Sequence, residues 1–137
     1  MTIEKLGSLN DKKIYILGEE WTIKVVDTES KNTIAKTLKA QNASMLTQLY
    51  RKEIWVSIND YISTDETQQM PNNNPAIDQD LTHELYHAFY YESGLDSSAI
   101  LPDDEAWPRN ETMIDWSAKM FPKILKVRRA LGISDNF

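Results

Sequence analysis

The chain has 137 residues, which suits one domain and leaves little room for a second. Apolar residues make up 41% and charged residues 26%, so the chain is too apolar for the disordered class. Its 21 acidic and 15 basic residues give a net charge of −6, whereas phosphate binding favours an excess of lysine and arginine. We therefore expect no nucleic acid among its main partners.

Cysteine is absent, which excludes disulfides and cysteine-ligated zinc or iron–sulfur sites. The longest apolar stretches are only a few residues, too short for a signal peptide core or a transmembrane helix. We therefore expect a cytoplasmic protein with no membrane partner.

The first half of the chain predicts two β-hairpins separated by a short helix. Apolar and polar residues alternate from Lys13 to Asp27 around a turn at Gly18-Glu19, which is typical of a hairpin. Apolar residues then recur at helical spacing over 30–42. A second hairpin is predicted from 44–50 and 53–59. In its second strand Trp55 alternates with Ile54 and Val56, so we expect Trp55 on the opposite sheet face, where it could contact a partner if exposed.

The second half predicts two helices, each preceded by a loop. Residues 61–76 and 96–108 lack periodicity and are rich in Asn, Asp or Pro, which is typical of loops. Residues 78–93 have a helical pattern with Gly94 as the stop. The last helix is expected from near Arg109 to Gly132, with Pro122 producing a kink or two consecutive helices. It carries an apolar stripe that we expect to face the core, formed by Met113, Trp116, Met120, Ile124, Val127 and Leu131.

The chain's only two histidines, His83 and His87, lie four residues apart with a glutamate between them. Residues at this spacing share one face of a helix, with Cβ atoms about 5–6 Å apart. Two imidazoles placed so can bind one metal ion, and Glu84 can reach a water in the open coordination position as general base. The sequence HELYH is therefore an H-E-x-x-H motif, which indicates a zinc site.

A catalytic zinc usually has three protein ligands, so an Asp or Glu must complete the set. The acidic residues available downstream are Asp96, Asp103, Asp104, Glu105, Glu111 and Asp115. Glu111 fits best because it lies on a predicted helix that can pack against the first, whereas a loop would hold a ligand less rigidly. Asp115 lies one turn later and can accept a hydrogen bond from a ligand imidazole.

His83-Glu84-x-x-His87 followed by Asn110-Glu111-x-x-x-Asp115 resembles the gluzincin branch of the zincin metallopeptidases. The segment HELYHAFYYESGL and the preceding hairpins also resemble small zincin-like proteins of bacteriophages and mobile elements. The resemblance implies that Glu111 is the third zinc ligand and that Asp115 supports a ligand histidine. It also implies an edge strand beside the active-site helix, for which we expect 54–59, and a host-cell cytoplasm if the gene is phage-borne.

Larger gluzincins add a downstream His, Tyr or Arg that stabilises the oxyanion, and this chain has no spare histidine. Tyr90, Tyr91 and Arg109 could serve, although packing better explains the two tyrosines and a surface position better explains the arginine. Loss of one oxyanion donor typically costs about 10²–10³ in rate.

The sequence thus predicts one α+β, zincin-like domain in which a small mixed or antiparallel sheet packs on the motif helix and a C-terminal helix. The predicted function is hydrolysis of peptide bonds in a protein or peptide substrate by a single Zn²⁺ ion, with Glu84 as base. The alternative is a zinc-stabilised binding module without turnover. Two histidines and one carboxylate also suit other divalent metals, including iron.

Overall fold

The computed structural model describes residues 1–62, 74–94 and 110–133. Within these ranges the fold is α+β, with helices arranged around one four-stranded mixed sheet. Most of the two predicted loops lies outside the described residues, and so does Arg109, near which the last helix was expected to begin. The structure therefore addresses the sheet, the motif helix and the last helix.

Both predicted hairpins are present. Strands β1 (Lys13–Ile16) and β2 (Glu19–Val26) pair antiparallel, and so do β3 (Met45–Gln48) and β4 (Glu53–Ser57). The first turn is formed by Leu17 and Gly18, both with positive φ, one residue earlier than predicted. Positive φ at both central residues matches the twist of a two-residue hairpin. The predicted short helix is α2 (Thr33–Ala40), capped by Asn32.

The order of the strands in the sheet is β1-β2-β4-β3, with β2 and β4 parallel. The expectation that residues 54–59 form the edge strand is therefore wrong, because β4 lies between β2 and β3. Four of its five residues are buried, as is typical of a strand covered on both faces. The edge strands are β1 and β3, and both contact the motif helix, β3 more extensively.

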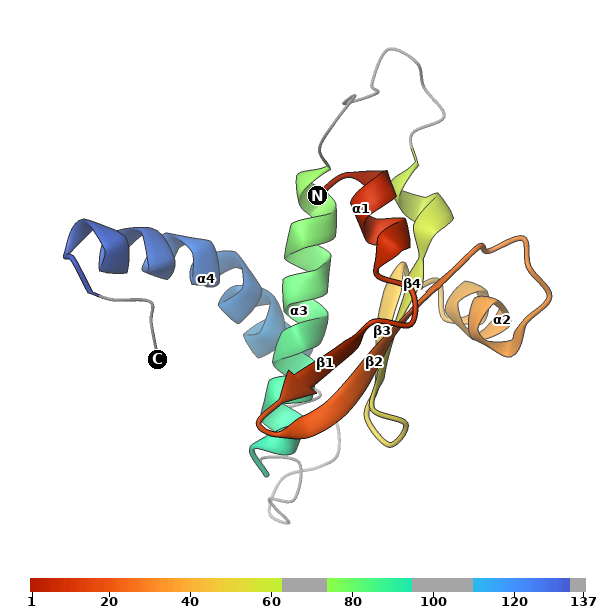
Figure 1. Cartoon of the computed structure of the whole chain (residues 1–137), viewed down its shortest axis with the longest axis horizontal. Helices are drawn as coiled ribbons and strands as arrows, with labels where there is room; N and C mark the ends of the chain where they lie inside the picture. The colour runs from red at the N-terminus through yellow and green to blue at the C-terminus, as the bar shows by residue number, and fades with distance from the viewer. Residues whose placement is uncertain (63–73, 95–109, 134–137) are drawn as a thin grey trace.

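Helix α3 (Pro75–Glu92) covers one face of the sheet and α2 lies on the other side (Figure 1). Ile54 and Val56 point into the core beneath α3, together with Ile77 and Ala88 from that helix. Trp55 points the other way, as alternation predicts, but it is only 4% exposed and Arg51 lies over its ring. The expected sheet face is therefore confirmed, and the exposure that a partner contact would require is not present.

Two short helical elements were not predicted from the sequence. The helix α1 (Ile3–Ser8) is capped by the Thr2 side chain and buries Leu6 in the core. The 3₁₀ helix η1 (Ile58–Tyr61) follows β4 directly and packs against α1. Together they close the end of the core near the start of α3.

Helix α4 (Glu111–Ala130) is one continuous helix with Pro122 inside it, so the option of two consecutive helices is wrong. It packs on α3 through its first part and then changes direction and projects from the rest of the molecule (Figure 1). The expectation that the apolar stripe of this helix faces the core is wrong for its exposed members, which are Trp116, Ile124, Val127 and Leu131. The buried side chains are those of Ile114, Ser117 and Ala118, because mostly small residues allow the two helices to approach closely.

Among the residues described, no helix combines the length and the apolar character that crossing a bilayer requires.

The C-terminal end of α3 is fixed to the sheet by a buried polar contact. The indole Nε1 of the fully buried Trp21 donates a hydrogen bond to Glu92 Oε1 over 2.9 Å. The Lys52 ammonium lies 3.1 Å from the same oxygen and 2.7 Å from Glu19. Removing the Glu92 carboxylate would leave the Trp21 N–H buried without this acceptor.

We expect Glu92→Ala to lower the free energy of unfolding by about 1–3 kcal/mol, the cost of an unsatisfied buried donor. The control is Glu20→Ala, which removes an exposed ion pair with Lys13 and should lower the free energy of unfolding much less than Glu92→Ala. Urea denaturation of both variants measures the difference. Equal losses would show that the buried contact has no special role.

Candidate metal centre

The H-E-x-x-H motif lies in the middle of the 18-residue helix α3. The helix begins at Pro75, the favoured residue type for a first helical position, and the Asn74 side chain accepts a hydrogen bond from the Ala76 amide. It ends before Gly94, which has a φ of +84°. The motif residues are therefore held by about two helical turns before them and about one and a half after them.

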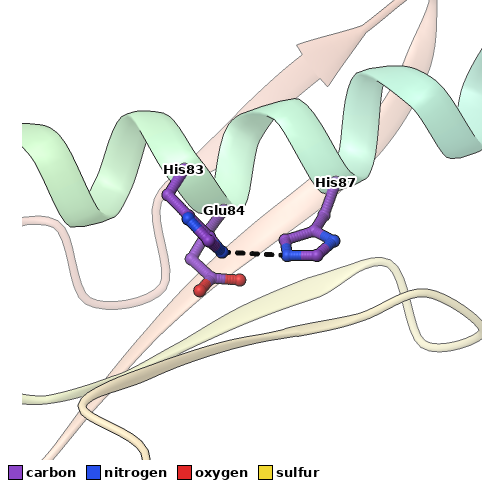
Figure 2. A group of neighbouring side chains, drawn as sticks. All are labelled: His83, Glu84 and His87. Atoms are coloured by element: carbon purple, nitrogen blue, oxygen red, sulfur yellow. Dashed lines mark hydrogen bonds between the residues drawn. The ribbon is translucent and has the colours of Figure 1, made fainter. Parts of the chain in front are cut away.

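His83, Glu84 and His87 project from the same side of α3 (Figure 2). The two Nε2 atoms lie 3.1 Å apart, and one ligand atom from each of the three residues falls within 4.8 Å of the others. His87 and Glu84 are each only 8% exposed. The Nε2 atoms of His83 and His87 thus converge on one point beside α3.

Glu111, the first residue of α4, brings its carboxylate to the same point. Its Oε2 lies 3.0 Å from His83 Nε2, and its Oε1 lies 3.3 Å from His87 Nε2. The structure therefore brings together the three residues that the sequence singled out as metal ligands.

Asp115 lies one turn further along α4 and contacts the opposite nitrogen of the His83 ring. Its Oδ1 is 2.8 Å from His83 Nδ1. An ionised carboxylate can only accept, so Nδ1 carries the proton in this contact. In a neutral His83 the lone pair is then on Nε2, which faces Glu111 and His87.

These residues fit a tetrahedral metal ion. Bonds of about 2.0–2.1 Å at tetrahedral angles place ligand atoms about 3.3–3.4 Å apart. The three separations among His83 Nε2, His87 Nε2 and the Glu111 oxygens are 3.0–3.3 Å, close to that value. A neutral His83 and an ionised Glu111 also point lone pairs at one another, an arrangement that a shared cation stabilises. Zn²⁺ suits this set of nitrogen and oxygen ligands, as do other divalent metals.

The Glu84 carboxylate is held on the sheet side of the site. Thr47 Oγ1, on β3, donates a hydrogen bond to Glu84 Oε2 over 2.5 Å and lies 3.1 Å from the Glu84 backbone oxygen. Burial raises the pKa of the Glu84 carboxyl above its ordinary value, while the Thr47 hydroxyl and the imidazoles act in the opposite direction. A carboxylate with a raised pKa beside a metal site suits proton transfer.

A cavity of about 430 Å³ opens beside these side chains, between α3 and the edge strand β3. It is large enough for part of a peptide. Its lining combines the predicted ligands and base with apolar side chains, and consists of Ala43, Met45, Leu46, Thr47, Leu49, His83, Glu84, His87 and Glu111.

The two tyrosines suggested as oxyanion donors do not line this cavity. The Tyr90 hydroxyl lies 3.2 Å from Ser117 Oγ, at the contact of α3 with α4. The Tyr91 ring packs edge-on against Trp21 and Tyr50. Arg109 and the alternative acidic residues Asp96, Asp103, Asp104 and Glu105 lie outside the described residues.

Thr47 is the residue near the site that sequence reasoning missed. It lies 37 positions before Glu84, on a strand that carries no motif. The alternation of Met45 and Thr47 does place both on the α3 side of β3, but it does not indicate which helical residue they meet.

Comparison with models of known protein families, with curated proteins and with solved structures finds no match to this chain.

We expect the purified protein to hold about one zinc ion per chain and His87→Ala to hold none after dialysis. Asp115→Asn should weaken zinc affinity about 10–100-fold, because this carboxylate orients His83. Elemental analysis and competition with a chromogenic chelator measure both effects. The exposed Glu29→Gln is the control and should bind like the parent, whereas equal zinc in the parent and His87→Ala would exclude the site.

Proposed function

We propose that this protein is a zinc-dependent metallopeptidase with a zincin-like fold of the gluzincin type. The observation that carries the proposal is the approach of the Glu111 carboxylate to both His83 and His87, with Asp115 bound to the far side of the His83 ring. Glu84, adjacent in sequence to His83, supplies a buried carboxylate on the cavity wall.

A divalent ion held by His83, His87 and Glu111 would supply a Lewis acid that acidifies water and polarises the substrate carbonyl. Glu84 accepts the proton that the water loses as its oxygen bonds to the carbonyl carbon. The same carboxyl then gives this proton to the amine as the C–N bond breaks, so the base is regenerated. Asp115 keeps the His83 proton on Nδ1 throughout.

The position of β3 at the edge of the sheet favours a protein or peptide in an extended conformation as the substrate. The Ser57 amide donates to the Ser44 carbonyl, so ladder alternation points the backbone groups of Met45 and Thr47 away from β4. An extended peptide can pair with such an edge, with its side chains in the adjacent cavity.

The second candidate function is a zinc-stabilised binding module without turnover. One observation favours it: neither Tyr90 nor Tyr91 lines the cavity, so no oxyanion donor is identified among the described residues. A module of this kind would gain thermal stability from zinc and would hydrolyse no peptide.

We expect Glu84→Gln to retain one zinc per chain and to lose at least 10²-fold in hydrolysis, because the amide cannot accept the proton. Dye-quenched casein and a mixed peptide library, read by fluorescence and mass spectrometry, measure the rate. Glu20→Gln, an exposed carboxylate away from the site, is the matched control and should retain full activity. Hydrolysis by zinc-loaded Glu84→Gln at the parent rate would contradict the mechanism, and absence of hydrolysis in the parent would favour the binding module.

A further inference from the structure

We propose that Thr47 is a positioning residue for Glu84. The Thr47 hydroxyl holds the Glu84 carboxylate in the orientation needed for proton transfer. The inference rests on the proposed function in one respect, namely that Glu84 is the general base. It assigns a role to a side chain on the edge strand, outside both helices that carry the motif residues.

The contact is short and partly buried. Thr47 Oγ1 lies 2.5 Å from Glu84 Oε2, a length typical of a hydroxyl bound to a charged carboxylate. The Glu84 backbone oxygen is also an acceptor, at 3.1 Å, but the hydroxyl has only one proton to donate. The shorter contact, to the carboxylate, therefore takes that proton.

The position of the hydroxyl is set by the sheet. Thr47 is paired with Ile54, which is fully buried in the central strand β4. A β-branched side chain on a strand has few allowed rotamers, so a fixed backbone also fixes Oγ1. Glu84, by contrast, has three side-chain torsions, and its helix determines only where the side chain begins.

Anchoring Oε2 leaves Oε1 as the oxygen available to exchange a proton with water and with the leaving amine. Without the hydroxyl the carboxylate can rotate away from the reacting atoms. A displacement of about 1 Å can cost about 10²-fold in rate. The position of the metal ligands should not change, because His83, His87 and Glu111 are held by α3 and α4.

The test compares Thr47→Val, which keeps the shape and removes the hydroxyl, with Thr47→Ser, which keeps the hydroxyl. For dye-quenched casein we expect Thr47→Val to lower kcat about 10–100-fold with KM and zinc content unchanged. Thr47→Ser should return kcat to within a few-fold of the parent. Thr22→Val, the same chemical change on β2, is the matched control and should leave kcat unchanged.

An unchanged kcat in Thr47→Val would overturn the inference, and so would a fall in kcat that comes with lost zinc or a changed KM. A crystal structure of Thr47→Val provides a readout that does not depend on turnover. We expect the Glu84 carboxylate to leave its parental position there, and a carboxylate in the same place would overturn the inference. If the zinc-loaded parent hydrolyses nothing, the proposed function fails, and this structural comparison alone decides whether Thr47 positions Glu84.

Discussion

The candidate site is built on the close approach of three groups that carry lone pairs. Two imidazole nitrogens and a carboxylate lie within 3.0–3.3 Å of one another. Lone pairs at this distance repel unless a proton or a metal ion lies between them. Helix α3 supplies the imidazoles and the first residue of α4 supplies the carboxylate, so the contact between these helices determines the geometry. The small buried residues Ser117 and Ala118 allow that contact.

The sheet contributes the other half of the site. The core beneath α3 fixes the helix relative to β4, and β4 in turn fixes the edge strand β3 through their antiparallel pairing. The same strand presents Thr47 to Glu84, and its outward backbone groups would pair with the proposed substrate. Chemistry and recognition would therefore share one rigid support, which agrees with the rule that precise sites are built on regular elements.

Local patterns predicted both hairpins, the helices α2, α3 and α4, and most of the candidate site, but not α1 or η1. Alternation located both hairpins, and the spacing of Glu111 and Asp115 placed two carboxylates on one face of α4. Such local patterns do not predict which strands are neighbours in the sheet. The parallel pairing of β2 with β4 moved β3 to the edge, although the run Ile54-Trp55-Val56 was a signal for a strand buried on both faces. Trp116 is exposed because it lies on the side of α4 opposite to the buried Ile114, Ser117 and Ala118, and periodicity does not reveal which side of a helix meets a neighbour.

The most direct measurement is a crystal structure of the zinc-loaded protein, with anomalous diffraction recorded on both sides of the zinc absorption edge. We predict one zinc peak about 2.0–2.2 Å from His83 Nε2, His87 Nε2 and a Glu111 oxygen. A zinc ion bound elsewhere, or a Glu111 side chain turned away from the two imidazoles with no other acid in its place, would contradict the proposed metal centre.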